Sequence, residues 1–365
     1  MIDAFALTVR AVRARAVDVA LARPVETSGG AMTTTPLVLI DLETEEDVTG
    51  RSYVRCYTPL ALEPLAGLVT NLGTTLAGHS GTPAEFAGKL ERHFGLLGRQ
   101  GLAAIAMAGI DMALWDACAA VTGVPLVTLL GGDAKPVPAY ATLRSMLPQA
   151  AAAEAEEAIA LGFTAVKLKV GGGDLQADLQ AIRAVRAAAG DTVKLMVDYN
   201  QSLSVPDALV RAAALDAENL HWIEEPTRAD DYDGHARIAA AARTPIQLGE
   251  NWWGPHDMEK SLAAGASDHV VLDAMKLGGI GGWLRAAALA EAAGLPASSH
   301  SFPEVSAHLL AVTPTAHLLE YLDHAAPILV EPIRVEDGHA LIPSRPGTGL
   351  EWDEEAVARY LVVHV

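Results

Sequence analysis

Three acidic residues recur at equal intervals in the second half of the chain. Asp198, Glu224 and Glu250 lie 26 residues apart, and each follows a short apolar run. Three carboxylates brought to one place would repel each other and lose hydration unless a cation lay between them. A ligand set made only of carboxylate oxygens favours a hard divalent ion, which predicts Mg²⁺. The alternative is that each acid separately caps the helix after its strand.

Two of the seven lysines of the chain, Lys167 and Lys169, lie two residues apart in the segment A-V-K-L-K-V. In a strand these two positions share a face, while the intervening apolar residues face the other way. A neighbouring ammonium group or metal cation disfavours protonation, so we expect a lysine pKa lowered from about 10.4 towards the range of a base. The alternative is that both lysines only form ion pairs with the carboxylates.

A histidine and an aspartate complete the set of residues that could do chemistry. His300 ends the segment S-S-H, and Asp273 ends the preceding apolar segment. A carboxylate beside an imidazole fixes its tautomer and raises its basicity. If Lys169 and His300 faced each other across a metal-chelated carboxylic acid, one base could remove the α-proton and the other could return a proton to the opposite face. That reaction is a racemisation through an enediolate.

Alternating strands and helices after Pro136 would position these side chains. The predicted strands are Val137–Thr142, Ala165–Val170, Lys194–Asn200, Trp222–Glu225, Pro245–Glu250, His269–Asp273, Pro296–His300 and His317–Leu322. The predicted helices between them include Gln149–Leu161, Leu175–Ala189, Val205–Ala217, Trp283–Ala293 and the short Glu304–Thr313. Eight such units are typical of an α/β barrel, where chemistry takes place at the C-terminal ends of the strands. The candidate residues lie at or near such ends.

The region before the barrel has a different order of elements. Predicted strands at 6–12, 36–42 and 48–57 precede predicted helices at 60–76, 83–94 and 102–121. Strands followed by a run of helices indicate an α+β domain. We place this domain at residues 1–130 and the barrel at 131–340, with the tail 341–365 returning to the first domain. The Gly-rich segment Val25–Thr35 is either a mobile loop over the site or a plain connection.

The composition argues against several classes of protein. The 365 residues are 51% hydrophobic and carry a formal net charge of −19, which argues against a nucleic-acid partner because phosphate binding needs clustered cations. Cys56 and Cys118 are too few for a disulfide framework. The N-terminus lacks a signal-peptide pattern, and Asp111 and Asp116 interrupt the apolar stretch 101–131, so no membrane span is expected. We therefore expect a cytoplasmic protein.

Together these segments resemble the enolase superfamily and, within it, the mandelate racemase subgroup. The segments that carry the resemblance are A-V-K-L-K-V-G, M-V-D-Y-N-Q-S-L, W-I-E-E-P-T, G-E-N-W-W-G-P, D-A-M-K-L-G-G-I-G-G-W and S-S-H-S-F-P-E-V-S-A-H-L-L. The resemblance covers nearly the whole chain. It implies a (β/α)7β barrel, a modified TIM barrel, under an N-terminal α+β capping domain that the C-terminal tail completes. It also implies a homo-octamer that acts on a small-molecule carboxylate.

The resemblance implies a role for each residue of the proton-transfer machinery. The three acids described first would hold Mg²⁺. Lys169 would be the base for one enantiomer and His300, oriented by Asp273, the base for the other. Lys167 would bind the substrate carboxylate and help to lower the pKa of Lys169. Glu320 would be the acid that hydrogen-bonds the developing enediolate.

The implied substrate pocket departs from the family pattern. Asn200 would contact the α-hydroxyl group, and Thr142 stands where a serine contacts the carboxylate. The residues implied around the rest of the substrate are Tyr57, Val25, Gly29, Met32 and Ser301. Valines are replaced at two of these positions and a leucine at Ser301, so we expect a pocket that is roomier and more polar than a phenyl ring requires.

Three functions remain open from the sequence. The first is a racemase that acts on an aromatic or otherwise bulky 2-hydroxy acid. The second is a dehydratase, in which the same enediolate expels a β-hydroxyl group, with His300 or Glu320 as general acid, and an acid sugar becomes a 2-keto-3-deoxy acid. The third is a non-catalytic protein that keeps the fold, and the presence of every expected site residue argues against it.

Overall fold

A four-stranded antiparallel sheet begins the fold. Its strands, in the order β3-β2-β1-β4, are Thr49–Arg55, Gly30–Thr44, Leu7–Thr27 and Ser80–Gly81. The structure is a computed structural model that describes residues 6–362, so the first residues of the N-terminal segment (1–5) and the last of the tail (363–365) lie outside the described residues. The strands β1 and β2 are much longer than we predicted. The segment Val25–Thr35, expected as a loop or connection, instead supplies the tip of their hairpin, which turns at Ser28 and Gly29.

Three helices cover the inner face of this sheet. They are α1 (Leu62–Leu76), α2 (Pro83–His93) and α3 (Gly101–Thr122), with the short η2 (Pro59–Ala61) before α1. By length and composition α3 could span a membrane, but 83% of its most apolar window is buried, so we assign it as the core helix of this domain. Glycines let the layers approach closely, because a Cβ at Gly109 would lie 2.4 Å from Ile40 Cδ1, and one at Gly50 would lie 2.0 Å from Ala113 O.

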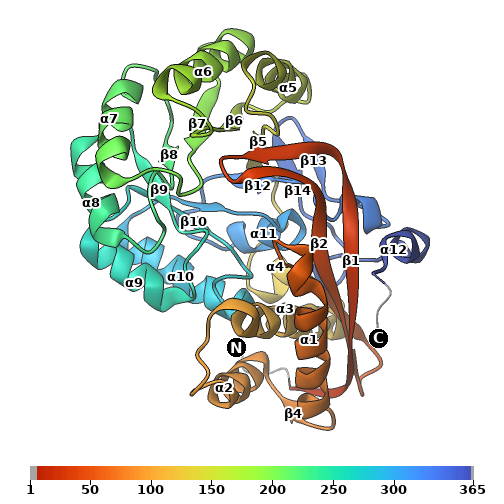
Figure 1. The fold of residues 1–365 in the computed structure, drawn as a ribbon. Coiled ribbons are helices and arrows are strands. Elements are labelled where there is room, and N and C mark those ends of the chain that lie inside the picture. The colour runs from red at the N-terminus through yellow and green to blue at the C-terminus, as the bar shows by residue number, and fades with distance from the viewer. Residues whose placement is uncertain (1–5, 363–365) are drawn as a thin grey trace.

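Eight parallel strands form a closed barrel within residues 6–362 (Figure 1). They are β5 (Val137–Thr142), β6 (Ala165–Lys169), β7 (Lys194–Asp198), β8 (Ile223–Glu224), β9 (Ile246–Leu248), β10 (His269–Leu272), β11 (Ala297–Ser299) and β12 (Leu319–Tyr321). Neighbours from β5 to β11 pair in sequence order, and β12 pairs with β5. The backbone N–H of Ser299 donates to the carbonyl of Leu318 at 3.0 Å, which joins β11 to the last strand. The predicted barrel is confirmed.

Seven helices connect the barrel strands and lie outside them (Figure 1). They are α5 (Pro148–Ala160), α6 (Leu175–Ala189), α7 (Val205–Leu215), α8 (Tyr232–Ala241), α9 (Pro255–Ala264), α10 (Gly279–Ala293) and α11 (Pro303–Leu310). The strand β12 is followed by η3 (Ala326–Ile328) instead of a barrel helix, so the unit is (β/α)7β, as the fold class requires. The short α4 (Leu126–Leu129) links α3 to the barrel.

The C-terminal tail returns to the first sheet. A small hairpin, β13 (Arg334–Glu336) and β14 (His339–Leu341), extends the barrel sheet beside β5, and α12 (Glu354–Tyr360) follows. Trp352 Nε1 donates to Asp41 Oδ1 on β2 at 2.8 Å, and the backbone N–H of Val362 donates to Ala16 O on β1 at 2.9 Å. These contacts complete the capping domain from the far end of the chain, as the predicted fold class requires.

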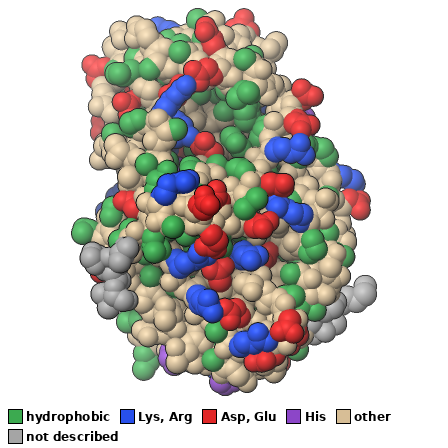
Figure 2. Space-filling view, turned by 90° about the vertical axis from the view of Figure 1, so that its right-hand side faces the viewer, with side chains coloured by type: hydrophobic (Ala, Val, Ile, Leu, Met, Phe, Trp, Pro, Cys, Tyr) green, Lys and Arg blue, Asp and Glu red, His purple; other side chains and the backbone are tan. Residues whose placement is uncertain are grey.

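The solvent face of the capping sheet carries charges of both signs. Arg10 pairs with Asp47 at 3.0 Å, and Arg13 pairs with Glu43 at 2.9 Å. On the face drawn in Figure 2, acidic and basic side chains are interspersed. A phosphate backbone would need a continuous basic surface, and on this face the basic side chains alternate with acidic ones (Figure 2).

Candidate active site at the mouth of the barrel

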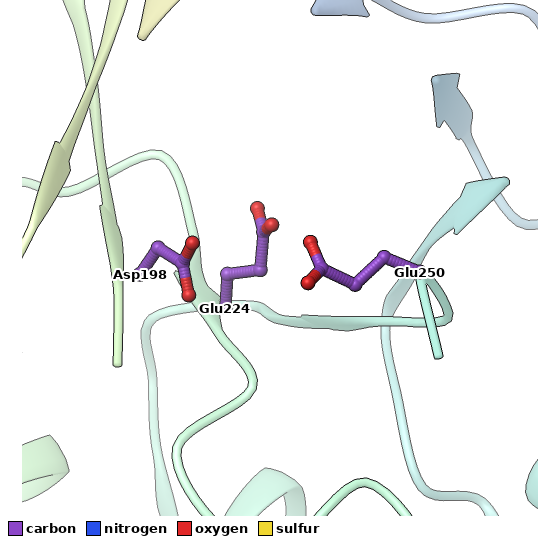
Figure 3. A group of neighbouring side chains, drawn as sticks. All are labelled: Asp198, Glu224 and Glu250. Atoms are coloured by element: carbon purple, nitrogen blue, oxygen red, sulfur yellow. The ribbon is translucent and has the colours of Figure 1, made fainter. Parts of the chain in front are cut away.

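The three equally spaced acids meet at the C-terminal ends of neighbouring strands. Asp198 ends β7, Glu224 ends β8, and Glu250 follows β9 by two residues. All three are buried, and one carboxylate oxygen from each lies within 4.8 Å of the other two. Figure 3 shows the carboxylates turned towards a common space. The shared direction follows from the fold, because parallel barrel strands present their C-terminal ends at one rim.

The protein compensates only part of the negative charge of this cluster. Lys167 Nζ lies 2.7 Å from Glu224 Oε1. Among the described residues no lysine or arginine lies within 4.0 Å of Glu250, whose Oε2 is 3.4 Å from His300 Nε2. Burial, and then Asp198 and Glu250, raise the pKa of Glu224 to about 8 against the opposing effect of Lys167. Buried, convergent, under-compensated oxygen donors fit a hard divalent cation.

A fourth carboxylate, Glu225, lies behind this cluster and was not singled out from the sequence. Asn251 Nδ2 donates to both of its oxygens, at 3.0 and 2.9 Å, and lies 3.4 Å from Glu250 Oε1. Lys276 Nζ in turn donates to Asn251 Oδ1 at 2.8 Å. Burial first, and then Glu250, raise the pKa of Glu225 well above its usual value. The doublet Glu224–Glu225 and the asparagine after Glu250 were the available sequence signals.

The two lysines of β6 have different surroundings. Lys167 lies between two carboxylates, 2.7 Å from Glu224 and 2.8 Å from Glu320, and its side chain is 1% exposed. Burial lowers its pKa, but these carboxylates outweigh burial and raise the pKa well above its usual value. Lys167 therefore stays charged, which is the state that its implied role of binding the substrate carboxylate requires.

Lys169 is the lysine that a bound molecule could reach. Its side chain is 12% exposed, and its Nζ lies 3.0 Å from Asp198 Oδ2 and 3.0 Å from Asn200 Oδ1. Asn200 is itself held by Asp198, which accepts from its backbone N–H at 2.7 Å and from its Nδ2 at 2.9 Å. We call Asp198, Glu224 and Glu250 the acidic row. The Lys169 ammonium group is thus fixed beside Asp198, at the β7 end of this row.

The predicted histidine–aspartate pair is present. His300 Nδ1 lies 2.6 Å from Asp273 Oδ2, and Nε2 faces Glu250 at 3.4 Å and Ser301 Oγ at 3.3 Å. Burial lowers the pKa of His300, but Glu250 and Asp273 outweigh it and raise the pKa to about 9. In this arrangement His300 is an imidazolium with Nε2 directed into the mouth.

Glu320 differs from its implied role as an acid. Its Oε1 accepts from Thr142 Oγ1 at 2.8 Å, and its Oε2 accepts from the backbone N–H of Ser301 at 2.9 Å. Burial raises its pKa, but Lys167 and then His300 outweigh burial and lower the pKa below its usual value. Glu320 is therefore a carboxylate here and would need a proton before it could donate one. Thr142 and Ser301 are thus linked to the site by their hydrogen bonds to the Glu320 carboxylate.

The two candidate bases flank the acidic row. Lys169 comes from the second barrel strand and contacts Asp198, and His300 follows the seventh strand and contacts Glu250. The acids come from the third, fourth and fifth strands, between the two bases along the sheet. A molecule bound over the acids would have the Lys169 side chain on one side and the His300 ring on the other.

The β1–β2 hairpin extends over the barrel from the capping domain (Figure 1). The backbone N–H of Glu26 donates to Arg144 O at 2.7 Å. Glu26 Oε2 accepts from Ser145 Oγ at 2.9 Å and from the backbone N–H of Met146 at 2.7 Å. These bonds attach the hairpin tip to the segment after β5. The hairpin tip therefore covers the C-terminal end of the barrel and is held there by these hydrogen bonds; we call it the cover.

The predicted pocket residues of the capping domain lie in and beside this cover. Val25 is buried and pairs with Met32 across the hairpin, and Gly29 is exposed at the turn. Met32 Sδ lies 3.3 Å from Arg55 Nη2, and the Arg55 guanidinium lies 4.7 Å from the centre of the Tyr57 ring. Met32 and Tyr57 thus lie against Arg55, an arginine that we did not select from the sequence, whereas Gly29 lies exposed at the turn.

Removing the carboxylate of Glu26 should loosen this cover. Glu26→Ala removes two hydrogen bonds of about 1 kcal/mol each, so amides of residues 25–32 should exchange with deuterium up to about thirtyfold faster. Hydrogen exchange followed by mass spectrometry measures this rate. Glu43→Ala, on the solvent face of β2, is the matched control and should leave the tip unchanged. Equal exchange at the tip in Glu26→Ala and in the wild type would contradict the assigned fastening.

Comparison with known proteins places both halves of the chain in one family. Residues 9–131 match the N-terminal domain of mandelate racemase and muconate lactonizing enzyme, and residues 150–356 match the enolase C-terminal domain-like family. The chain therefore belongs to the mandelate racemase and muconate lactonizing enzyme family of the enolase superfamily.

Relatives in this family carry out different reactions. The chain is 34% identical to 3,6-anhydro-α-L-galactonate cycloisomerase of Streptomyces coelicolor, over 93% of this chain and 95% of that protein. It is 36% identical to L-talarate/galactarate dehydratase of Salmonella typhimurium, over 71% of this chain and 66% of that protein. The crystal structure of an enolase from Bradyrhizobium, complexed with magnesium and mandelic acid, superposes with a TM-score of 0.93 at 45% identity, covering 99% of this chain and 100% of that one.

Proposed function

We propose that the protein is a Mg²⁺-dependent enzyme that removes the α-proton of a 2-hydroxy carboxylate to form an enediolate, and that it returns the proton as a racemase. The observation that carries this proposal is the placement of Lys169 and His300 at opposite ends of the acidic row. A single-base enzyme would need only one of them. Two bases on two sides are what proton transfer between the faces of one carbon requires.

We assign the metal to Asp198, Glu224 and Glu250. Their burial, convergence and incomplete compensation by cations support the assignment, as do relatives crystallised with bound magnesium. When bound, Mg²⁺ would withdraw electron density from the substrate carboxylate and so acidify the α-proton. The chain supplies the rest of the chemistry through its own side chains.

The proton-transfer roles follow the contacts of each side chain. Lys169 Nζ, in its neutral form, takes the α-proton on one face, and His300 Nε2 exchanges a proton with the other face. Asp273 keeps the proton on His300 Nδ1 and so directs Nε2 at the substrate. Lys167 remains a cation and holds the substrate carboxylate. Asn200 orients the α-hydroxyl group from beside Lys169.

Dehydration of an acid sugar is the second candidate function. The pKa of His300, raised to about 9 by Glu250 and Asp273 against burial, favours an imidazolium that can give its proton to a leaving β-hydroxyl group. The open turn at Gly29 and the hydroxyl of Ser301 would also suit a polyol chain. The likeness to a sugar-acid dehydratase supports the same alternative.

Incubation of the Mg²⁺-loaded protein in D₂O separates the two candidates. The panel contains single enantiomers of mandelate-like acids and a set of sugar acids. Deuterium at Cα together with the appearance of the opposite enantiomer supports racemisation. Loss of water and formation of a 2-keto acid supports dehydration. No exchange with any acid would contradict both.

Three wider features are also proposed from the family resemblance. We assign the capping domain to residues 1–130 with 341–365 and the barrel to 131–340, and the N-terminal family match, which ends at residue 131, supports the first of these limits. A homo-octamer and a cytoplasmic location complete the proposal. Light scattering on the purified protein measures the assembly directly.

A further inference from the structure

A buried arginine without an acidic partner lies at the roof of the candidate site. Arg55 ends β3 and is 5% exposed. Among residues 6–362, no carboxylate oxygen lies within 4.0 Å of its guanidinium nitrogens, and its Nε makes no hydrogen bond. The guanidinium instead contacts Met32 Sδ and the Tyr57 ring. A thioether is a weak acceptor, and an aromatic face offsets only a small part of a buried charge.

Two other cations nearby have carboxylate partners, whereas Lys276, which is also buried, contacts Asn251 and the Tyr57 ring. Lys167 contacts Glu224 and Glu320, and Arg144 forms an ion pair with Asp323. Burying a guanidinium without an anion is costly, because its hydration is lost and nothing replaces it. The missing carboxylate at Arg55 therefore indicates a partner that the described residues do not supply. Guanidinium groups match carboxylates through paired hydrogen bonds.

The orientation of β3 directs Arg55 at the barrel. Alternate residues of a strand share a face, and Tyr53, two residues before Arg55, donates from its hydroxyl to Glu304 on α11 at 2.6 Å. The backbone N–H of Arg55 lies 3.4 Å from the sulfur of Met275, two residues after Asp273. The guanidinium thus belongs to the layer between the capping sheet and the strand ends of the barrel.

His324 supplies a second unpartnered polar atom in the same region. It follows β12, is buried, and its Nδ1 has no hydrogen-bond partner among the described residues. Burial, and then Arg55 and Arg144, lower the pKa of His324 well below its usual value. Glu320 and His300 lie close enough to affect the same imidazole. The neutral His324 imidazole therefore lies close both to Arg55 and to the site residues Glu320 and His300.

We propose that Arg55 and His324 form a second anion subsite, which receives the distal carboxylate of a dicarboxylic 2-hydroxy acid. The inference rests on the proposed function, because the first carboxylate of the same molecule would lie over the acidic row. Arg55 supplies the charge and His324 Nδ1 a hydrogen bond to the distal carboxylate or a neighbouring hydroxyl group. A monocarboxylic acid leaves the Arg55 charge without a partner, so the subsite selects diacids over aryl or monocarboxylic acids.

Matched pairs of acids test this subsite. Galactarate and galactonate differ only in the group at C6, and so do glucarate and gluconate; tartrate and threonate form a shorter pair. Calorimetry on the Mg²⁺-loaded full chain should show one diacid binding about 100-fold more tightly than its monoacid, as expected for a buried charge-assisted pair. Arg55→Met should abolish that preference and leave monoacid binding little changed, and Arg55→Lys should restore part of it. Arg144→Met, whose arginine already has Asp323, is the control and should keep the preference.

The outcomes separate the subsite from the chemistry. Equal binding of diacid and monoacid by the wild type in all three pairs would overturn the subsite, and so would a preference that survives in Arg55→Met. If Arg55→Met weakened the binding of a diacid and of its matched monoacid equally, Arg55 would have a structural role, and this result would also count against the subsite. If Arg55→Met fails to fold, the diacid preference is measured in Arg55→Gln and compared with the preference of the wild type for the same pairs of acids. An Arg55-dependent preference without α-proton exchange would uphold the subsite while rejecting the proposed reaction.

Discussion

Lys169→Ala should abolish exchange of the α-proton from one stereoisomer of the substrate while exchange from the other stereoisomer persists. Lys169 is the only described lysine at the β7 end of the acidic row that is partly exposed, and His300 serves the opposite end. Removal of a general base lowers a rate by about 10² to 10⁴-fold. NMR of each stereoisomer in D₂O, with Mg²⁺ present, measures both exchange rates separately.

Two further variants make this test specific. His300→Asn should show the reverse pattern, with exchange lost from the stereoisomer that Lys169→Ala spares. Lys194→Ala removes an exposed lysine from the first position of β7, at the opposite end of the barrel, and should leave both rates unchanged. Loss of exchange from both stereoisomers in Lys169→Ala would contradict the assignment of two separate bases.

Glu250→Gln should weaken Mg²⁺ binding by at least about 100-fold, beyond the loss usual for residues that only support a ligand. Glu250 is the member of the acidic row without a lysine partner among the described residues. Its cationic contact is the His300 imidazolium at 3.4 Å, so a bound metal would add the positive charge that lysines supply to the other two acids. Titration calorimetry measures the affinity. Chelation with EDTA should abolish turnover in the wild type, and added Mg²⁺ should restore it.

The same substitution should change stability in opposite directions with and without the metal. Without Mg²⁺, removing one of several repelling buried charges should raise the unfolding temperature of Glu250→Gln above that of the wild type. With Mg²⁺ the wild type should gain stability and the variant should gain little, because only bound ligand stabilises the native state. Glu259→Gln, an exposed acid on α9, is the control. An unfolding temperature of the wild type that is the same with and without Mg²⁺ would contradict the metal assignment.

The sequence predicted the rim of the barrel well for a physical reason. Parallel strands in a closed barrel end at one rim, so residues at successive strand ends must meet whatever the loops between them do. Asp198, Glu224 and Glu250 could therefore be grouped without knowing a single distance. The strand Val137–Thr142 and the helix Leu175–Ala189 were predicted with the bounds that the structure shows.

The electrostatic detail of the site could not be predicted in the same way. Whether Lys167 gains or loses a proton depends on carboxylates at 2.7 and 2.8 Å, and the sequence gives no such distances. Glu320 was assigned as an acid for the same lack of information. Its contact with Lys167 and the neighbouring His300 keep it ionised. Lys167 and Glu320 were predicted as site residues, but their protonation states depend on which side chains pack against them in the folded protein.

Contacts between the two domains were equally inaccessible. The hairpin tip at Glu26 becomes ordered strand because it meets the segment after β5, about 120 residues further along the chain. Arg55 follows a simple alternation with Tyr53 and Tyr57, which could have marked it as an inward-facing arginine. That Arg55 has no carboxylate partner among residues 6–362 becomes visible only in the folded structure.

The central claim is that the chain removes an α-proton at the mouth of the barrel with Lys169 and His300. Its most direct test is the fate of the α-hydrogen of 2-hydroxy acids, followed by NMR in D₂O with Mg²⁺, in the wild type and in the double variant Lys169→Ala/His300→Asn. We expect the wild type to exchange or lose the α-hydrogen of at least one acid, and the double variant to do neither while still binding Mg²⁺. A wild type that retains every α-hydrogen, or a double variant that exchanges as fast as the wild type, would contradict the claim.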